Sequence, residues 1–247
     1  MKPDERLRTM RPALTAILMI GVFSAAAWAA ATAYEVGWKG QLRDTHAGDV
    51  SGKVSLAELP RSANLYAVGP VADLGGEITV IDGRLLLARL EHGNLKTSAE
   101  YQGQASFLVW ATVPQWQDAV ALGERAPSHA DLEKLIEAKA RSAGLDPDKP
   151  FPFMLRGTLA SVKYHVLRPS QSQAGHTAST SHTASALNVQ EGGKRGTIIG
   201  FYSKKHEGVF THSGSFAHLH VLLADGDSGH VDELEIGPDV ELLLPRV

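Results

Sequence analysis

Apolar and polar positions alternate along most of the chain beyond residue 60, a pattern typical of β-strands with one buried face. The longest such run, residues 64–90, is interrupted by Gly75-Gly76 and by Asp82-Gly83. An Asp-Gly pair between two β-rich runs predicts a tight hairpin at that point. Further strands are expected within residues 106–113, 151–167, 195–203, 216–224 and 231–245.

One segment, residues 128–144, has the spacing of a helix instead. Ser128 is a suitable N-cap with Asp131 three residues later, and Gly144 is a suitable terminator. A second, short helix starting at Ser55 is expected within residues 54–59. The predicted fold class is therefore α+β and predominantly β, with mixed or antiparallel sheets and one main helix.

The first 29 residues have the pattern of a targeting segment. A basic lead precedes an apolar run at residues 14–30, and Ala27–Ala29 and Ala31–Ala33 both have the A-x-A pattern of a cleavage site. This predicts a signal peptide over residues 1–29, cleaved as late as residue 33, and a periplasmic or secreted protein. The alternative is an uncleaved membrane anchor, because the run is near the short end for a bilayer span.

Composition limits the remaining possibilities. The 247 residues include no cysteine, so stability must come from the apolar core and from any bound metal. The net charge is −3 and no basic run follows the amino-terminal segment, so nucleic acid is not expected as a partner.

Three histidines lie close together in the stretch FAHLHVLLADGDSGHV, residues 216–231. His218 and His220 point to the same face of the predicted strand, and apolar residues on both faces indicate that this strand is buried. Buried imidazoles need polar partners, and a turn after the strand can return His230 to them. Three histidines with an open fourth position are typical of catalytic Zn²⁺. Ordinary hydrogen bonds, with His230 on a surface turn, are the alternative.

The segment from Gly196 to Ile236 resembles the zinc-binding half of the alpha-acetolactate decarboxylase family. The family pattern is G-T-hydrophobic-hydrophobic-G-F, then H-L-H, then G-H-V after an acidic turn. The corresponding segments here are residues 196–201, 218–221 and 228–231. Residues 68–85, 105–113 and 132–163 are similar to further family segments in the same order, so the resemblance covers residues 60 to 245.

This resemblance implies a two-lobed fold over residues 60–247, with the metal site between the lobes and a homodimer as a possible assembly. Residues 30–59 would form an amino-terminal arm. The implied reaction is the zinc-dependent decarboxylation of 2-acetolactate, a small 2-hydroxy-3-oxo acid, to acetoin and CO2. In this reaction the metal stabilises the negative charge left by CO2, and a nearby acid delivers a proton.

The resemblance also assigns site residues. His218, His220 and His230 correspond to the metal ligands, and Glu77 falls on the active-site glutamate of the family. The position of the family's arginine is taken by His165, which lacks the permanent charge and the planar two-pronged geometry of arginine. Arg168 is the alternative for this role. We expect Glu77 and His165 to be the catalytic residues.

A second family carboxylate has no counterpart at the matching position, and Asp73, Glu207 and Glu233 are candidates to replace it. A carbon–carbon lyase is the favoured function. The alternative is an exported zinc-binding homologue that has lost or changed the decarboxylase activity, either a binding protein or a metal-dependent hydrolase.

Overall fold

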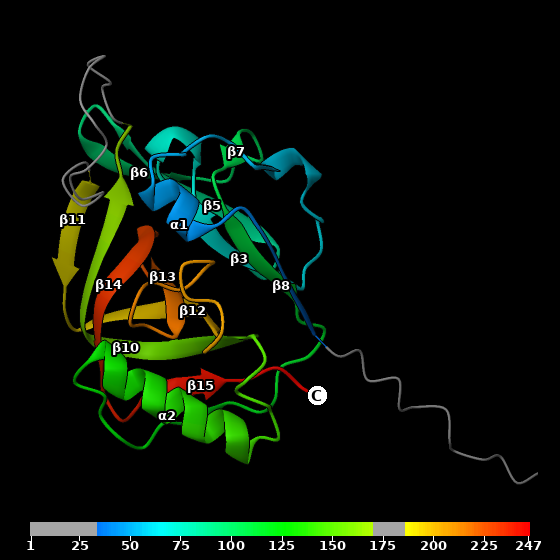
Figure 1. The fold of residues 1–247 in the computed structure, drawn as a ribbon. Helices are drawn as coiled ribbons and strands as arrows, with labels where there is room; N and C mark the ends of the chain where they lie inside the picture. The colour runs from blue at the N-terminus through cyan, green and yellow to red at the C-terminus, as the bar shows by residue number, and fades with distance from the viewer. Residues whose placement is uncertain (1–33, 170–185) are drawn as a thin grey trace, which may run out of the picture. The chain divides into compact units, whose positions relative to one another are not determined.

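The computed structural model describes residues 34–169 and 186–247. The predicted signal peptide lies outside the described residues. Within them, no helix is long and apolar enough to cross a membrane. The described residues form two main β-sheets and one long helix (Figure 1).

The first sheet has six antiparallel strands in the order β1-β8-β3-β4-β5-β6. Their bounds are β1 Glu35–Lys39, β3 Leu65–Pro70, β4 Glu77–Ile81, β5 Arg84–Glu91, β6 Asn94–Ser98 and β8 Leu108–Thr112. Asp82 and Gly83 connect β4 to β5 with φ angles of 51° and 70°. Both angles are in the left-handed region that a tight hairpin turn requires, which confirms the predicted hairpin.

The second sheet follows the order β12-β13-β14-β10-β15-β9, with β11 also paired to β10. Its strands are β9 Val120–Ala121, β10 Phe151–Leu167, β11 Ala186–Glu191, β12 Lys194–Tyr202, β13 Ala217–Leu223, β14 Ser228–Ile236 and β15 Glu241–Leu243. Strand β10 is 17 residues long; it pairs with β12 along its first half and with β14 along its second half. The strands β12, β13, β14 and β10 therefore close into a ring.

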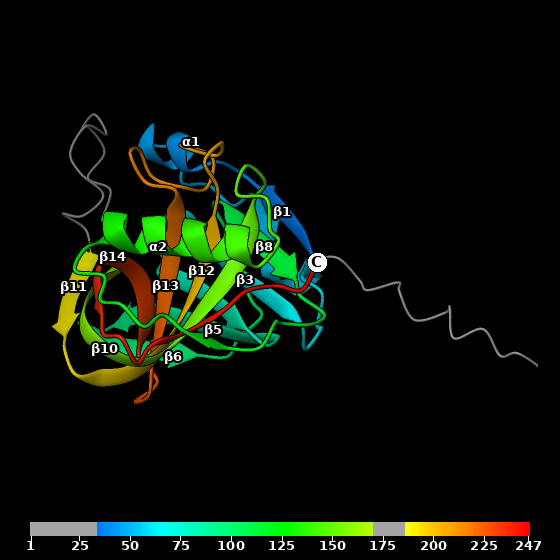
Figure 2. The same cartoon turned by 90° about the horizontal axis from the view of Figure 1, so that it is seen from below.

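The main helix is α2, His129–Ser142, and it packs on the second sheet. The Ser128 side chain accepts a hydrogen bond from the backbone N–H of Asp131, as an N-cap does. Leu132, Ile136 and Ala140 are buried against the sheet core. Figure 2, seen from below, shows α2 crossing in front of strands β12 and β13. The predicted α+β class with one main helix is thus confirmed.

The two sheets pack against each other through a shared apolar layer. Tyr66, Val68 and Val109 of the first sheet lie in one cluster with Ile199 and Phe201 of the second. Burying an aromatic or branched side chain stabilises a fold by about 1.5–3 kcal/mol. This layer holds the facing residues of the two sheets at fixed separations and confirms the two-lobed arrangement.

The amino-terminal arm takes part in the first sheet. Strand β1 pairs with β8, and the five-residue helix α1, Leu42–His46, follows it. The short helix expected within residues 54–59 is present only as one turn of 3-10 helix with Ser55 at its N-cap position. Strand β2, Val54–Ser55, pairs there with β7, Gln104–Ala105, and only a 3-10 turn, Leu56–Glu58, follows. The pairing with β7 directs the backbone away from an α-helix, and Ser55 makes no capping bond. A second 3-10 turn spans Ala72–Leu74.

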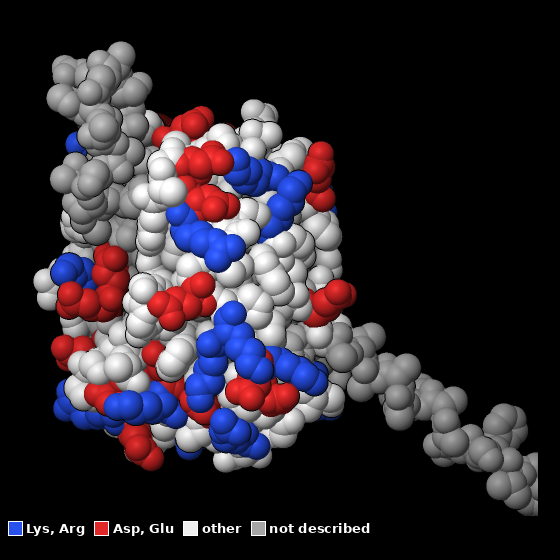
Figure 3. Space-filling view, in the orientation of Figure 1, with Lys and Arg blue, Asp and Glu red and all other residues white. Residues whose placement is uncertain are grey.

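Basic and acidic side chains are mixed on the face of the molecule seen in Figure 3. Ion pairs at the surface of the molecule include Lys163 with Glu233 and Lys194 with Asp225. Exposed pairs of this kind are screened by solvent and add little stability, so the fold depends mainly on its apolar layers.

Candidate metal centre

The three histidines of the sequence motif meet on the β13–β14 hairpin. His220 and His230 are direct partners in the two antiparallel strands, and His218 is two residues before His220 on the same face. Leu219 and Val221, on the opposite face of β13, are buried in the core. The side chains of His218, His220 and His230 are only 2%, 0% and 7% exposed. Strand β13 is thus buried on both faces, and the turn brings His230 back to the other two histidines.

Three ring nitrogens converge at the spacing of metal ligands. Nε2 of His218 lies 3.3 Å from Nε2 of His220 and 3.1 Å from Nδ1 of His230. Zinc binds histidine nitrogens at about 2.0–2.1 Å, which places two ligands of a tetrahedron about 3.3 Å apart. The residues present therefore fit a tetrahedral divalent ion with one further position open.

Hydrogen bonds on the far side of two rings fix their orientation. Nδ1 of His218 donates to the backbone carbonyl of Phe210 at 2.7 Å, which leaves the Nε2 lone pair free for a metal. Nδ1 of His220 lies 2.9 Å from Oγ1 of Thr79, and that oxygen also accepts a hydrogen bond from Ser228. Partners of this kind set the tautomer and direction of metal-binding histidines.

Burial also sets the protonation state of these rings. It lowers the pKa of His218 to about 3, with a further contribution from neighbouring His212. The pKa values of His220 and His230 are also held well below the ordinary value, first by burial and then by neighbouring histidines. All three rings are neutral near pH 7, as a metal ligand must be.

Glu77 faces the histidine cluster from the other sheet. Its Oε2 lies 3.8 Å from Nε2 of His220, and the residue is 1% exposed. Burial raises the pKa of Glu77 well above its ordinary value, and the charge of Asp232 adds to the effect. Glu77 and Thr79 are two residues apart on β4, so both point from the first sheet toward the histidine cluster of the second.

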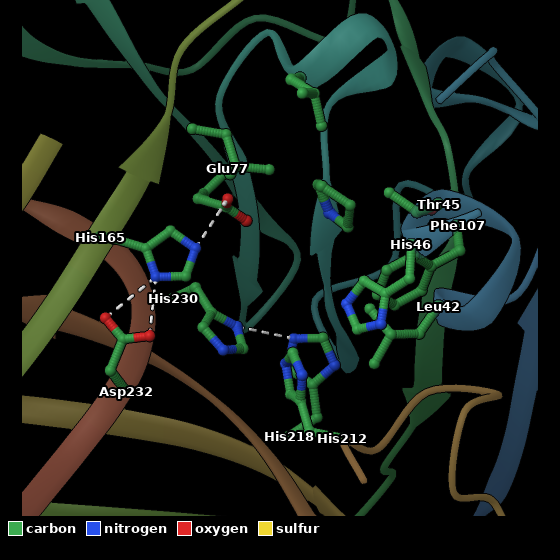
Figure 4. Close-up of a pocket in the computed structure, with 13 residues that line it drawn as sticks. Leu42, Thr45, His46, Glu77, Phe107, His165, His212, His218, His230 and Asp232 are labelled. Atoms are coloured by element: carbon green, nitrogen blue, oxygen red, sulfur yellow. Dashed lines mark hydrogen bonds and ion pairs between the residues drawn. The ribbon is translucent and has the colours of Figure 1, made fainter. Parts of the chain in front are cut away.

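His165 lies between Glu77 and β14 (Figure 4). Its Nε2 is 3.9 Å from Oε1 of Glu77, and its ring centroid is 4.8 Å from that of His230. Nδ1 of His165 lies 2.9 and 3.0 Å from the two carboxylate oxygens of Asp232. His165, His230 and Asp232 form a second group whose ligand atoms lie within 4.8 Å of one another.

The other candidates from the sequence lie elsewhere. Arg168 is exposed beyond the end of β10 and does not line the cavity. Glu233 pairs with Lys163 at the surface, and Glu207 accepts a hydrogen bond from Ser213. Asp73 is in a 3-10 turn outside the cavity wall. The carboxylate that the structure brings to the site is Asp232, which the sequence analysis missed.

The histidine cluster, Glu77, His165 and Asp232 lie at a cavity of about 390 Å³. Its apolar wall is formed by Leu42, Pro70, Leu74, Phe107 and Leu167, and its polar wall by Thr45, His46, Glu77, His165, His212, His218, His230 and Asp232. A second cavity of about 290 Å³ shares His212, His230 and Asp232 with the first. Among the described residues, those lining the two cavities include no lysine or arginine. His46 and His212, on helix α1 and the loop before β13, carried no sequence signal.

Residues 40–245 of the chain match the family model described as alpha-acetolactate decarboxylase. The chain belongs to the alpha-acetolactate decarboxylase family. It is thus related to a family of metal-dependent carboxy-lyases, and its buried three-histidine group lies where the two sheets of this fold meet.

Solved structures share the fold of this acetolactate decarboxylase family member. The alpha-acetolactate decarboxylase of Bacillus subtilis strain 168 is 17% identical, with a TM-score of 0.64 over 85% of this chain and 83% of that chain. The acetolactate decarboxylase of Bacillus subtilis subspecies spizizenii is 16% identical, with a TM-score of 0.69 over 86% of each chain. A Staphylococcus aureus protein of unknown function similar to alpha-acetolactate decarboxylase is 18% identical, with a TM-score of 0.65 over 85% and 84%. No curated protein matches the chain.

Proposed function

We propose that the protein decarboxylates 2-acetolactate, or a closely related β-keto acid, to acetoin and CO2 with a zinc ion held by His218, His220 and His230. The observation that carries this proposal is the position of Glu77. A buried carboxyl group lies 3.8 Å from a nitrogen of a three-histidine cluster, at a cavity between two sheets. This arrangement supplies a metal and an acid to one small substrate.

The cavity walls suit a substrate with both methyl groups and polar oxygens. Leu42, Leu74 and Phe107 give the cavity an apolar surface in addition to its polar side chains. When bound, a divalent ion supplies a Lewis acid that stabilises the negative charge left on the substrate as CO2 departs. His218, His220 and His230 would hold this ion, and the rings of His218 and His220 are already fixed by Phe210 and Thr79.

Glu77 is the proton donor in this proposal. Burial raises its pKa and so favours the protonated carboxyl group, which can give its proton to the carbon from which CO2 leaves. His165 adjoins Glu77 and would contact the substrate oxygens where the family has arginine. Because an imidazole lacks the permanent charge and the two-pronged geometry of a guanidinium, we expect weaker binding of the substrate anion.

The test is acetoin formation from racemic acetolactate by purified, zinc-loaded protein. Glu77→Gln should lower kcat by about a hundredfold or more while zinc stoichiometry stays at that of the unaltered protein. A protein that binds zinc fully but forms no acetoin would contradict the decarboxylase proposal and favour a binding protein or a hydrolase.

We also propose that residues 1–29 direct export and that the mature protein is periplasmic or secreted. The basic lead, the apolar run and the A-x-A patterns support this proposal. Amino-terminal sequencing of the native protein should find a start near Ala30 or Tyr34. A native chain that starts at Met1 would contradict cleavage.

A further inference from the structure

Strand β14 contains one extra residue beside the histidine cluster. In its pairing with β10, Lys163 is opposite Glu233 and Tyr164 is opposite Val231, so Asp232 has no partner. This is a β-bulge, which inserts an unpaired residue and redirects the side chains around it.

The bulge changes which residues of β14 face the core after Asp232. Asp232 is two residues after His230, so the two side chains share the cavity face, as in a regular strand. Val231 and Leu234 both lie in the apolar core although they are three residues apart, and a regular strand would place them on opposite faces. The extra residue shifts the alternation by one position, so that Leu234 reaches the core and Glu233 is exposed and pairs with Lys163.

The carboxylate of Asp232 contacts the ring of His165 at Nδ1. Both carboxylate oxygens lie within 3.0 Å of Nδ1, and the His165 side chain is only 11% exposed. An ionised carboxylate can only accept a hydrogen bond, so Nδ1 carries the hydrogen. In a neutral ring this leaves Nε2 as an acceptor, and Nε2 faces Oε1 of Glu77 at 3.9 Å.

We propose that Asp232 is a positioning residue for His165. It fixes the tautomer and the direction of the imidazole, so that Nε2 is presented to Glu77 and to the substrate. The catalytic consequence rests on the proposed function, but the tautomer does not. A carboxylate that orients a histidine in this way is a general feature of catalytic and metal sites.

The first test reads the tautomer directly. Nitrogen-15 NMR of the imidazoles distinguishes Nδ1–H from Nε2–H in both zinc-loaded and metal-free protein, and His165→Gln assigns the His165 signals by their loss. The unaltered protein should show the Nδ1–H form, and Asp232→Ala should shift His165 largely to Nε2–H. An Nε2–H form in the unaltered protein, or an unchanged tautomer in Asp232→Ala, would overturn the proposal.

The second test reads the reaction. Asp232→Ala and Asp232→Asn should lower kcat for acetolactate by about tenfold or more, with KM changed by less than about twofold. Asparagine keeps the side-chain shape but offers both a donor and an acceptor, so it does not select one tautomer. Asp232→Asn is therefore the variant to measure if Asp232→Ala fails to fold. The matched control is Glu233→Gln, which breaks the exposed pair with Lys163 on the neighbouring rung and should change neither readout.

The two readouts separate this inference from the proposed function. If the unaltered protein forms no acetoin, the decarboxylase proposal fails, and the NMR result still decides whether Asp232 orients His165. If acetoin is formed and Asp232→Ala changes the tautomer but not kcat, the catalytic consequence of the positioning is overturned while the decarboxylase proposal stands.

Discussion

Thr79 and His220 join the two sheets through one buried hydrogen bond. Oγ1 of Thr79, on β4 of the first sheet, lies 2.9 Å from Nδ1 of His220, on β13 of the second. Ser228 donates to the same oxygen at 3.0 Å, so the hydroxyl is fixed in place. The orientation of one proposed metal ligand therefore depends on the packing between the sheets.

Replacing this hydroxyl should weaken metal binding without removing the ligand. Thr79→Val keeps the shape but loses the acceptor, and we expect zinc affinity to fall about tenfold to a hundredfold. Competition against a chelator measures this affinity. Thr97→Val is the matched control, because Oγ1 of Thr97 is buried without a hydrogen-bond partner. Equal affinities in the two variants would contradict the orienting role.

Removing a ligand should have a larger effect. His218→Ala should lose most of the bound metal, because two remaining histidines do not complete the tetrahedral set. Metal analysis of the purified variant measures this. His92→Asn, in a turn on the first sheet with a φ of 52°, is the control and should keep the metal of the unaltered protein. Full metal content in His218→Ala would refute the ligand assignment.

Metal-free protein should become less stable as the pH falls from about 6.5 to about 4. Burial lowers the pKa of His218 to about 3 and that of His212 to about 4, so these rings gain protons on unfolding. Stability from such groups is present above the unfolded pKa of about 6.5 and is lost below it, by at most about 1.4 kcal/mol per pH unit for each ring.

Glu77 opposes this trend, because its raised pKa favours folding at low pH and costs stability above its unfolded pKa. Five histidines with lowered pKa values outnumber it, namely His206, His212, His218, His220 and His230. Urea unfolding of metal-free protein across this range measures the net slope, and His212→Asn should reduce it. A free energy of unfolding that is constant or rises toward pH 4 would contradict the prediction.

Restoring the family's arginine alone should gain little. In His165→Arg, the adjacent Asp232 would bind the guanidinium in a two-pronged ion pair and keep it from the substrate. The double variant His165→Arg, Asp232→Ala frees the guanidinium and should lower KM for acetolactate about tenfold. Steady-state kinetics of both variants provide the comparison. An equal fall in KM in the single variant would show that Asp232 does not bind the arginine.

Local patterns in the sequence predicted much of the fold. Asp82-Gly83 specified a turn, and Ser128 specified the start of α2, because both depend on neighbouring residues alone. The meeting of His218, His220 and His230 was also local, since one hairpin holds all three. Glu77 was found only through resemblance to the family, because nothing near it in the sequence indicates what it faces.

The groups that were missed depend on tertiary packing. Thr79 contacts His220 across 141 positions of sequence, and His212 lies on a loop without a periodic pattern. One feature of the sequence around Asp232 could have indicated its unusual position. The apolar residues Val231 and Leu234 are three apart within a strand, which indicates a bulge between them. Its pairing with His165 could not be predicted, because that pairing depends on where the strand β10 bends.

The closeness of the histidines in sequence has a consequence for the order in which the site assembles. His218 and His230 are 12 positions apart, whereas Thr79 meets His220 only after 141 positions have been brought together. Contacts of short separation cost less chain entropy and form earlier in folding. We therefore expect the nascent β13–β14 hairpin to assemble its metal ligands before Glu77 arrives, so that an incompletely folded chain can capture zinc while it still has no acid.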